Sequence, residues 1–207
     1  MNRLIATLVA LALIAAFAGL SSPFAAQQEE PLAIGKPAPT FKLPGVDGKD
    51  CDLAELLKTN KAVVVVFMSN DCPIAAAYQD RLIEIQKDYK DKGVQVVAIG
   101  SNDPQIASGD TFEGMKKRAE EKKYNFPYVR DESQDVARAY RATTTPHVFL
   151  LDAKGALAYR GAIDDSTDVK KVKEQFLRPA LDSLLAGKPI EKPTTKQFGC
   201  TIKWKKK

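Results

Sequence analysis

Three cysteines and one histidine are the residues of this 207-residue chain that could carry nucleophilic or redox chemistry. The cysteines, Cys51, Cys72 and Cys200, lie far apart, so no pair has the close spacing of a zinc or iron–sulfur site. Three are too few for a disulfide-built scaffold, and an odd number leaves at least one thiol unpaired in a monomer. The cysteines therefore favour reactive thiol chemistry.

Cys72 stands at the most informative position, between an apolar run that ends at Phe67 and a helical pattern that starts with Pro73. Proline suits the first position of a helix, so we expect Cys72 to be the N-cap residue. The free N–H groups and positive dipole end of a helix favour the thiolate and lower the pKa of a cysteine placed there. Because the thiolate is the attacking form, we predict that Cys72 is a nucleophile. The alternative is a small buried residue without reactivity.

The start of the chain has the layout of a secretory signal peptide, which we assign to residues 1–26. One positive charge in residues 1–3 precedes the uncharged run 4–20, and Ala16-Phe17-Ala18 is a cleavage candidate. An uncleaved membrane anchor is the alternative, because a run of about 17 residues is at the lower limit for a bilayer span. We expect export to a periplasmic or other extracytoplasmic compartment, where cysteine pairs persist. Residues 27–34 read as a linker.

The elements that would position Cys72 form a strand–helix–strand unit. Residues 62–67 are apolar and β-branched, as in a strand covered on both faces, and residues 94–99 form a second such strand. Apolar residues at spacings of three and four predict the buried face of the helix between them: Ala75, Tyr78, Leu82, Ile85 and Tyr89. Its other faces are expected to carry Gln79, Asp80, Lys87 and Asp88. Such a crossover implies parallel strands.

The second half of the chain continues the α/β pattern. We expect a short first strand at 41–43, a charged helix at 111–122, a strand at 126–129, a short helix at 133–140 and a hairpin formed by 148–152 and 157–160. The last helix is predicted from an apolar stripe, with Pro179 as a kink and Gly187 as its end: Val169, Val172, Phe176, Ala180 and Leu184. The domain then spans 35–187, and residues 188–207 form an extended tail with Cys200.

Several motifs resemble the redoxin group of the thioredoxin superfamily, which includes alkyl hydroperoxide reductase and thiol-specific antioxidant proteins. More narrowly, the chain is similar to its peroxiredoxin-like members. The resemblance rests on residues 35–43, 102–103, 126–128, 131–134, 159–161, 163–165, 199–204, the Cys72-Pro73 turn and Thr145-Pro146. It implies a thioredoxin fold, in which helices flank a central mixed β-sheet in three α/β/α layers.

The resemblance also implies roles for individual residues. Thr145 and Pro146 would form a cis-proline turn that faces Cys72 and binds an extended substrate as an added strand. Cys200 is the candidate resolving thiol, since an oxidised single cysteine needs a second thiol for turnover. A structural Cys51–Cys200 disulfide is the competing pairing, and the sequence leaves all three pairings open.

Four positions depart from the patterns of the family. Ala75 stands where a thioredoxin has its second cysteine, and Ser69 where some relatives have an earlier cysteine. In a typical peroxiredoxin, Val65 and Ser69 would be a proline and a threonine, which puts peroxidase chemistry in doubt. Val66 stands where thioredoxins hold a buried acid.

The remaining candidates have simpler interpretations. His147 either tunes Cys72 or is a structural strand residue. The acidic pairs 131–132 and 164–165 read as turn and helix-cap residues rather than a metal site. With 31 basic and 26 acidic residues of mixed order, the net charge of +5 argues against a nucleic-acid partner.

These observations lead to two hypotheses of different class. In the first, the chain is an exported thiol–disulfide oxidoreductase that acts through Cys72 on protein thiols, disulfides or small oxidants, with antioxidant activity as a variant. It would need an outside thiol reductant and no cofactor, since no glycine-rich phosphate loop follows a strand. In the second, it is a non-catalytic thioredoxin-fold binding module. Membrane contact is expected only through the N-terminal segment.

Overall fold

The computed structural model describes residues 30–206 of the chain. The predicted signal peptide or anchor, and residues 27–29 of the predicted linker, lie outside the described residues. Within the described range, no helix is long and apolar enough to cross a membrane.

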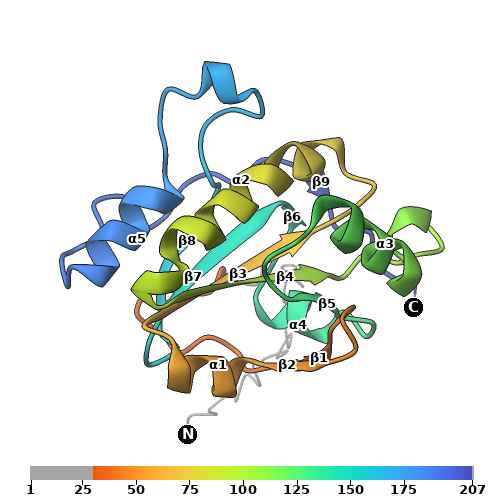
Figure 1. The fold of residues 1–207 in the computed structure, drawn as a ribbon, viewed down its shortest axis with the longest axis horizontal. Coiled ribbons are helices and arrows are strands. Elements are labelled where there is room, and N and C mark those ends of the chain that lie inside the picture. Colours follow the sequence, from red (N-terminus) through yellow and green to blue (C-terminus); the bar gives the residue numbers. More distant parts are fainter. Residues whose placement is uncertain (1–29, 207) are drawn as a thin grey trace, which may run out of the picture.

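A five-stranded mixed sheet forms the centre of the molecule, with strand order β5-β4-β3-β7-β8 (Figure 1). Its strands are β3 (Ala62–Met68), β4 (Val94–Gly100), β5 (Tyr128–Arg130), β7 (His147–Asp152) and β8 (Leu157–Gly161). β3, β4 and β5 are parallel, whereas β7 is antiparallel to both β3 and β8. The predicted strand–helix–strand unit and the hairpin are thus confirmed.

Helices cover both faces of this sheet. The helices are α1 (Leu53–Thr59), α2 (Pro73–Tyr89), α3 (Phe112–Lys122), α4 (Asp135–Ala139) and α5 (Leu177–Leu185). Successive residues of a strand point to opposite faces. Val64 and Val66 pack with α2, α3 and α5, while Val63 and Val65 pack with α1 and α4. This confirms the three-layer thioredoxin fold and explains why β3 is apolar at every position.

Short elements complete the fold. They are β1 (Lys42–Pro44), β2 (Asp50–Asp52), β6 (Thr144–Thr145), β9 (Cys200–Thr201) and the 3-10 turns η1 (Lys90–Lys92), η2 (Ser108–Asp110) and η3 (Val169–Lys171). β1 pairs with β2 in a small antiparallel sheet, as expected for a strand closed by a tight turn.

The predicted apolar stripe of α2 is buried as expected, but Gln79 is a correction. Gln79 is 1% exposed, and its Oε1 accepts a hydrogen bond from Arg118 of α3. Gln86 is equally buried, and its side chain bonds the backbone of Val94 and Val96 in β4. Helix α3 covers Gln79 and strand β4 covers Gln86, and each buried side-chain amide has a hydrogen-bond partner there.

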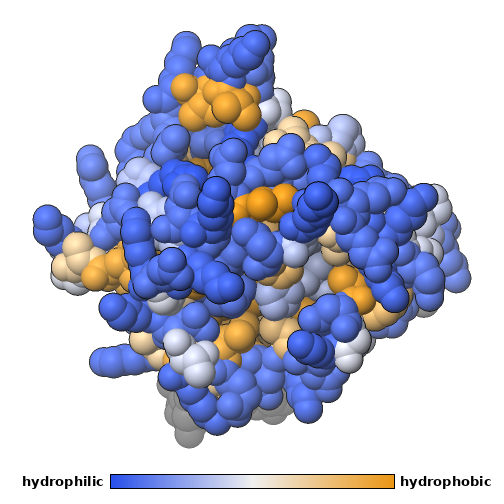
Figure 2. All heavy atoms as spheres, viewed as in Figure 1, coloured by the Kyte–Doolittle hydropathy of each residue, from blue (hydrophilic) through white to orange (hydrophobic). Residues whose placement is uncertain are grey.

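The last helix is shorter than predicted. Val169 and Val172 belong to a loop between β8 and α5 that projects from the molecule (Figure 1), and Val169 is 65% exposed. Figure 2 shows hydrophobic atoms at the tip of this projection. Pro179 lies in the first turn of α5, where a missing N–H has no intrahelical partner to lose, so it does not act as the predicted kink.

The tail after α5 lies on the domain surface. Backbone bonds between Arg160 and residues 193 and 195 fix it beside β8, and β9 then pairs antiparallel with β6 (Figure 1). This path carries Cys200 back to the end of the sheet where α2 begins.

Candidate functional site

Cys72 is the N-cap residue of α2, as predicted. Its backbone is extended, with φ −90° and ψ 111°, and its Sγ accepts a hydrogen bond from the Ala75 N–H at 3.3 Å. Pro73 follows within the first turn, where proline fits without loss of a hydrogen bond. The sulfur is therefore aimed at the helix N-terminus, and the whole residue is only 2% exposed.

Thr145 and Pro146 face this sulfur. The peptide bond between them is cis, which confirms the predicted turn, and the Thr145 carbonyl oxygen lies 3.1 Å from Cys72 Sγ. Thr145 is buried, and its Oγ1 has no hydrogen-bond partner. The turn thus presents backbone rather than a charged side chain to the cysteine.

Cys200 lies directly beside Cys72. In the β6–β9 pair, Cys200 is the register partner of Thr145, whose carbonyl oxygen lies 3.1 Å from Cys72 Sγ, and each of the two thiols shifts the pKa of the other. Gly199 makes this approach feasible, because a Cβ on it would come 2.1 Å from the Thr145 carbonyl oxygen. The structure therefore brings together the four residues that the sequence predicted for the site: Cys72, Thr145, Pro146 and Cys200.

Cys51 is not part of this group. It is buried in the cluster that contains α1 and α4, whereas Cys72 and Cys200 pack in the cluster that contains α2. Burial, followed by the nearby charges of Asp47 and Asp52, raises the pKa of Cys51 to about 11. All three cysteines are free thiols in this structure. Its geometry favours a Cys72–Cys200 pair over the competing Cys51–Cys200 pair.

The surroundings of the two thiols shift their pKa values in opposite directions. Burial opposes ionisation of Cys72, but hydrogen bonds from the Cys200 thiol, the Ala75 N–H and the Cys200 backbone outweigh it and lower the pKa of Cys72. Burial and the adjacent Cys72 raise the pKa of Cys200 to about 11, although Lys203 and the Ile74 N–H act in the opposite direction. Of the two thiols, Cys72 therefore loses its proton more readily.

A buried carboxylate, Asp110, holds the loop before Cys72. Its oxygens accept hydrogen bonds from the Ser69 hydroxyl, the Asn70 N–H and the Asn102 side chain. Asp110 is fully buried and 38 positions from Cys72, so no local pattern in the sequence pointed to it. The Ser69 hydroxyl is committed to Asp110 at 2.6 Å, so it does not replace the peroxiredoxin threonine beside the nucleophile.

The same network reaches the segment that carries Cys200. Asn102 Oδ1 accepts from the Lys203 N–H at 2.8 Å, and Gln134 bonds both the Lys203 carbonyl and the Lys205 N–H. The Arg138 guanidinium stacks over the ring of Trp204. Asp110 and Asn102 therefore connect the Cys72 loop to the Cys200 segment through buried polar contacts.

His147 is a structural residue. It is 2% exposed, its ring packs on Phe149 at 4.4 Å, and its Nδ1 accepts from the Thr143 N–H. Burial, and secondarily the charge of Arg160, lowers the pKa of His147 to about 3. The imidazole is neutral at ordinary pH and cannot donate a positive charge to Cys72.

The acidic pairs have structural roles. Asp131 accepts hydrogen bonds from the Ala137 N–H and the Ser101 hydroxyl and thus caps α4. Asp164 is a buried ion-pair partner of Arg81 and also accepts from the Tyr78 hydroxyl, a stronger anchor than the predicted turn role. No cluster of three or more His, Cys, Asp or Glu that could hold a metal occurs among residues 30–206.

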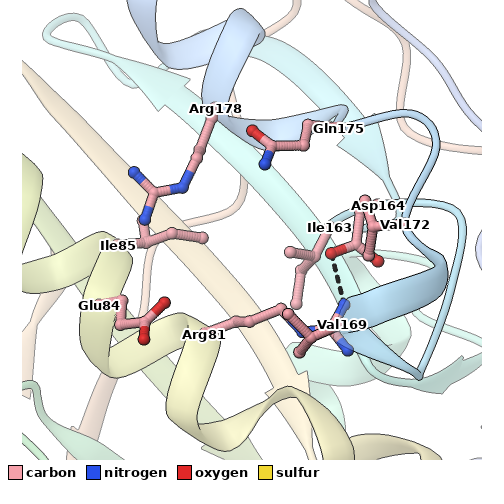
Figure 3. Close-up of a pocket in the computed structure, with 9 residues that line it drawn as sticks. All are labelled: Arg81, Glu84, Ile85, Ile163, Asp164, Val169, Val172, Gln175 and Arg178. Carbon is pink, nitrogen blue, oxygen red and sulfur yellow. Dashed lines mark hydrogen bonds and ion pairs between the residues drawn. The ribbon is translucent and has the colours of Figure 1, made fainter.

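A separate pocket of about 390 Å³ lies between α2, α5 and the projecting loop (Figure 3). The Arg81–Asp164 ion pair lies at its wall, and Arg81 also bonds the carbonyls of Ser166 and Thr167. None of the residues that line it belongs to the cysteine site. The contacts of Arg81 with Asp164, Ser166 and Thr167 hold the base of the projecting loop against α2.

Comparison with known proteins agrees with the fold. A family model described as Redoxin matches residues 33–176. The chain belongs to the redoxin family. An uncharacterized conserved protein from Geobacillus kaustophilus has a similar crystal structure, with TM-score 0.79 and 41% identity, over 85% of this chain and 94% of that chain.

Two further relatives extend the comparison. The crystal structure of a hypothetical protein from Sinorhizobium meliloti matches with TM-score 0.80 and 36% identity, over 86% of this chain and 98% of that one. The thiol-disulfide oxidoreductase ResA of Bacillus thuringiensis is 28% identical over 156 residues, which cover 74% of this chain and 84% of ResA.

Proposed function

We propose that this redoxin is a thiol–disulfide oxidoreductase whose redox couple is Cys72 and Cys200. The observation that carries the proposal is the position of both thiols at the cis-proline turn: Cys200 is the register partner of Thr145, and the Thr145 carbonyl oxygen lies 3.1 Å from Cys72 Sγ. The similarity to ResA, named as a thiol-disulfide oxidoreductase, supports the same class of reaction.

The couple would work in two exchange steps. In the reduced protein no covalent bond ties Cys200 to Cys72, and the segment that carries Cys200 moves aside. The Cys72 thiolate then attacks one sulfur of a disulfide R–S–S–R′, so a bond forms between Cys72 Sγ and the R sulfur, and R′–S⁻ leaves. Cys200 then loses its proton and attacks Cys72 Sγ, which releases R–S⁻ and closes the Cys72–Cys200 disulfide. The substrate gains two electrons from the protein, and an outside thiol must then reduce the Cys72–Cys200 disulfide.

Disulfide exchange is favoured over peroxidase chemistry by the position of Ser69. A peroxidatic thiolate needs donors that stabilise the leaving oxygen. The Ser69 hydroxyl donates to Asp110 instead, and the threonine and proline of typical peroxiredoxins are replaced by Ser69 and Val65. Antioxidant activity is therefore the secondary form of the proposal, to be measured as peroxide consumption.

Export is part of the proposal and rests on the signal-like residues 1–26. A Cys72–Cys200 disulfide can persist in an oxidising compartment. N-terminal sequencing of protein from the native host tests this, with a mature start between residue 19, directly after the Ala16-Phe17-Ala18 candidate, and residue 27 as the expected result. A cytoplasmic protein with an intact N-terminus would contradict it.

The decisive test of function is disulfide exchange by the mature chain. Reduced protein is incubated with glutathione disulfide, and linked peptides are mapped without reduction. We expect a Cys72–Cys200 disulfide and the release of two glutathione molecules per chain. Cys51→Ser is the matched control, and it should form the same disulfide and release the same amount of glutathione. Loss of activity is expected in Cys72→Ser and Cys200→Ser. No exchange in the wild-type protein would instead support a binding module without redox turnover.

A further inference from the structure

We propose that the outside thiol that regenerates this protein attacks the sulfur of Cys200, and that Cys72 is the leaving group. This inference rests on the proposed Cys72–Cys200 couple and names the point at which a reductant enters. It follows from how the C-terminal segment covers the site.

Access to the two sulfurs is unequal. Cys72 is 2% exposed and is enclosed by the Thr145 carbonyl, the first turn of α2 and Cys200. Cys200 is partly exposed, and its neighbours Gly199 and Thr201 are both exposed. An approaching thiol therefore meets Cys200 before it meets Cys72.

Several contacts hold the cover, and in the oxidised protein the Cys72–Cys200 bond ties it to Cys72 as well, so it cannot move aside before that bond breaks. The Ile202 N–H donates to the Thr143 carbonyl, and the Lys203 N–H donates to Asn102. The Lys203 carbonyl accepts from the Asp103 N–H, and the Ile202 side chain is 4% exposed in the core. Lifting this segment would break these hydrogen bonds and expose an apolar side chain.

Leaving-group chemistry points in the same direction. A thiol of lower pKa leaves faster in disulfide exchange. If Cys200 is attacked, the leaving sulfur is Cys72, which accepts the Ala75 N–H at 3.3 Å at the positive end of α2. If Cys72 were attacked, the leaving sulfur would be Cys200, whose pKa is raised to about 11, first by burial.

The proposed step balances as follows. An outside thiolate R–S⁻ forms a bond to Cys200 Sγ, the Cys72–Cys200 bond breaks, and its electron pair goes to Cys72 as thiolate. A second outside thiolate attacks the R sulfur of the R–S–S–Cys200 mixed disulfide. Cys200 leaves and takes up a proton. Two outside thiols are thereby oxidised to one disulfide, and the protein receives two electrons.

The test is to locate the first mixed disulfide. Oxidised mature Cys51→Ser protein is mixed with glutathione, quenched in acid at short times, alkylated and mapped by mass spectrometry. We expect chains with glutathione on Cys200 and an alkyl group on Cys72 to exceed the reverse labelling by about tenfold or more, since access and leaving-group pKa act together. Equal labelling, or glutathione mainly on Cys72, would overturn the inference.

A second variant guards against migration of glutathione between the two sulfurs. Asn102→Ala removes the side chain that accepts from Lys203 and loosens the cover. We expect its share of Cys72-linked glutathione to rise, and an unchanged distribution would count against the inference. If the oxidised protein contains no Cys72–Cys200 link before glutathione is added, the proposed function fails instead, so the two failures are distinguishable.

Discussion

Thr145 is the register partner of Cys200 in the β6–β9 pair, and its carbonyl oxygen lies 3.1 Å from the sulfur of Cys72. One residue of the cis-proline turn thus contacts both proposed redox cysteines. The edge at which the sequence predicted an added substrate strand is occupied by the chain's own C-terminal segment. In the proposed couple, Cys200 on this strand takes the place of the vicinal cysteine that is absent at Ala75.

Oxidation should stabilise the protein. A Cys72–Cys200 disulfide closes a loop of about 130 residues, which reduces the entropy of the unfolded chain and adds about 5 kcal/mol to the free energy of unfolding. Urea denaturation of the oxidised and reduced mature protein measures the difference. This difference in the free energy of unfolding should persist in Cys51→Ser and disappear in Cys200→Ser. A difference that disappears in Cys51→Ser would contradict the Cys72–Cys200 pairing.

The reactivity of Cys72 should depend on pH in a way that Cys200 controls. Burial alone would raise the pKa of Cys72, and the Cys200 thiol is foremost among the hydrogen bonds that lower it. Cys200→Ala removes that donor, so the midpoint of alkylation by iodoacetamide should rise to higher pH. The rate of alkylation, measured from acid to alkaline pH, checks this. An unchanged midpoint would show that the Cys200 thiol does not lower the pKa of Cys72.

Local signals in the sequence were enough for much of the fold and site. The apolar run of β3, the Cys72-Pro73 cap and the Thr145-Pro146 turn each depend on neighbours in sequence, and all three predictions are confirmed. The path of the tail and the extent of α5 depend on distant contacts. Arg81 holds Asp164 and two loop carbonyls, which keeps Val169 out of the helix that its spacing suggested.

Asp110 should be required to position the Cys72 loop. In Asp110→Asn, an amide donor would face the donors of Ser69, Asn70 or Asn102, and a buried donor without a partner costs about 2 kcal/mol. We expect that loss in the free energy of unfolding, together with slower closure of the Cys72–Cys200 disulfide. The exposed Asp91, changed to Asn, is the matched control. Equal effects of the two substitutions would contradict the positioning role.

Gly199 should be required for the approach of Cys200. A Cβ at this position would come 2.1 Å from the Thr145 carbonyl oxygen and 2.7 Å from its carbon, so the segment must move away. In Gly199→Ala we expect disulfide closure to slow by about tenfold or more, because the sulfurs lose their alignment. Alkylation of Cys72 by a bulky maleimide should become faster. Lys196→Ala, an exposed change in the same tail, should leave both rates as in the wild type.

Because buried His147 resists protonation, the free energy of unfolding should fall in mild acid, while the reaction of Cys72 should not change. Its pKa is lowered to about 3 in the folded protein, first by burial, and is about 6.5 when unfolded. Between these values only the unfolded chain binds the proton, so the free energy of unfolding falls as pH falls, by about 1.4 kcal/mol per pH unit. Denaturation at several values from pH 7 to pH 5 should show this slope in the wild type and a smaller one in His147→Phe. The pH dependence of Cys72 alkylation should be the same in both proteins, and a shift in that profile would assign the imidazole a role at the site.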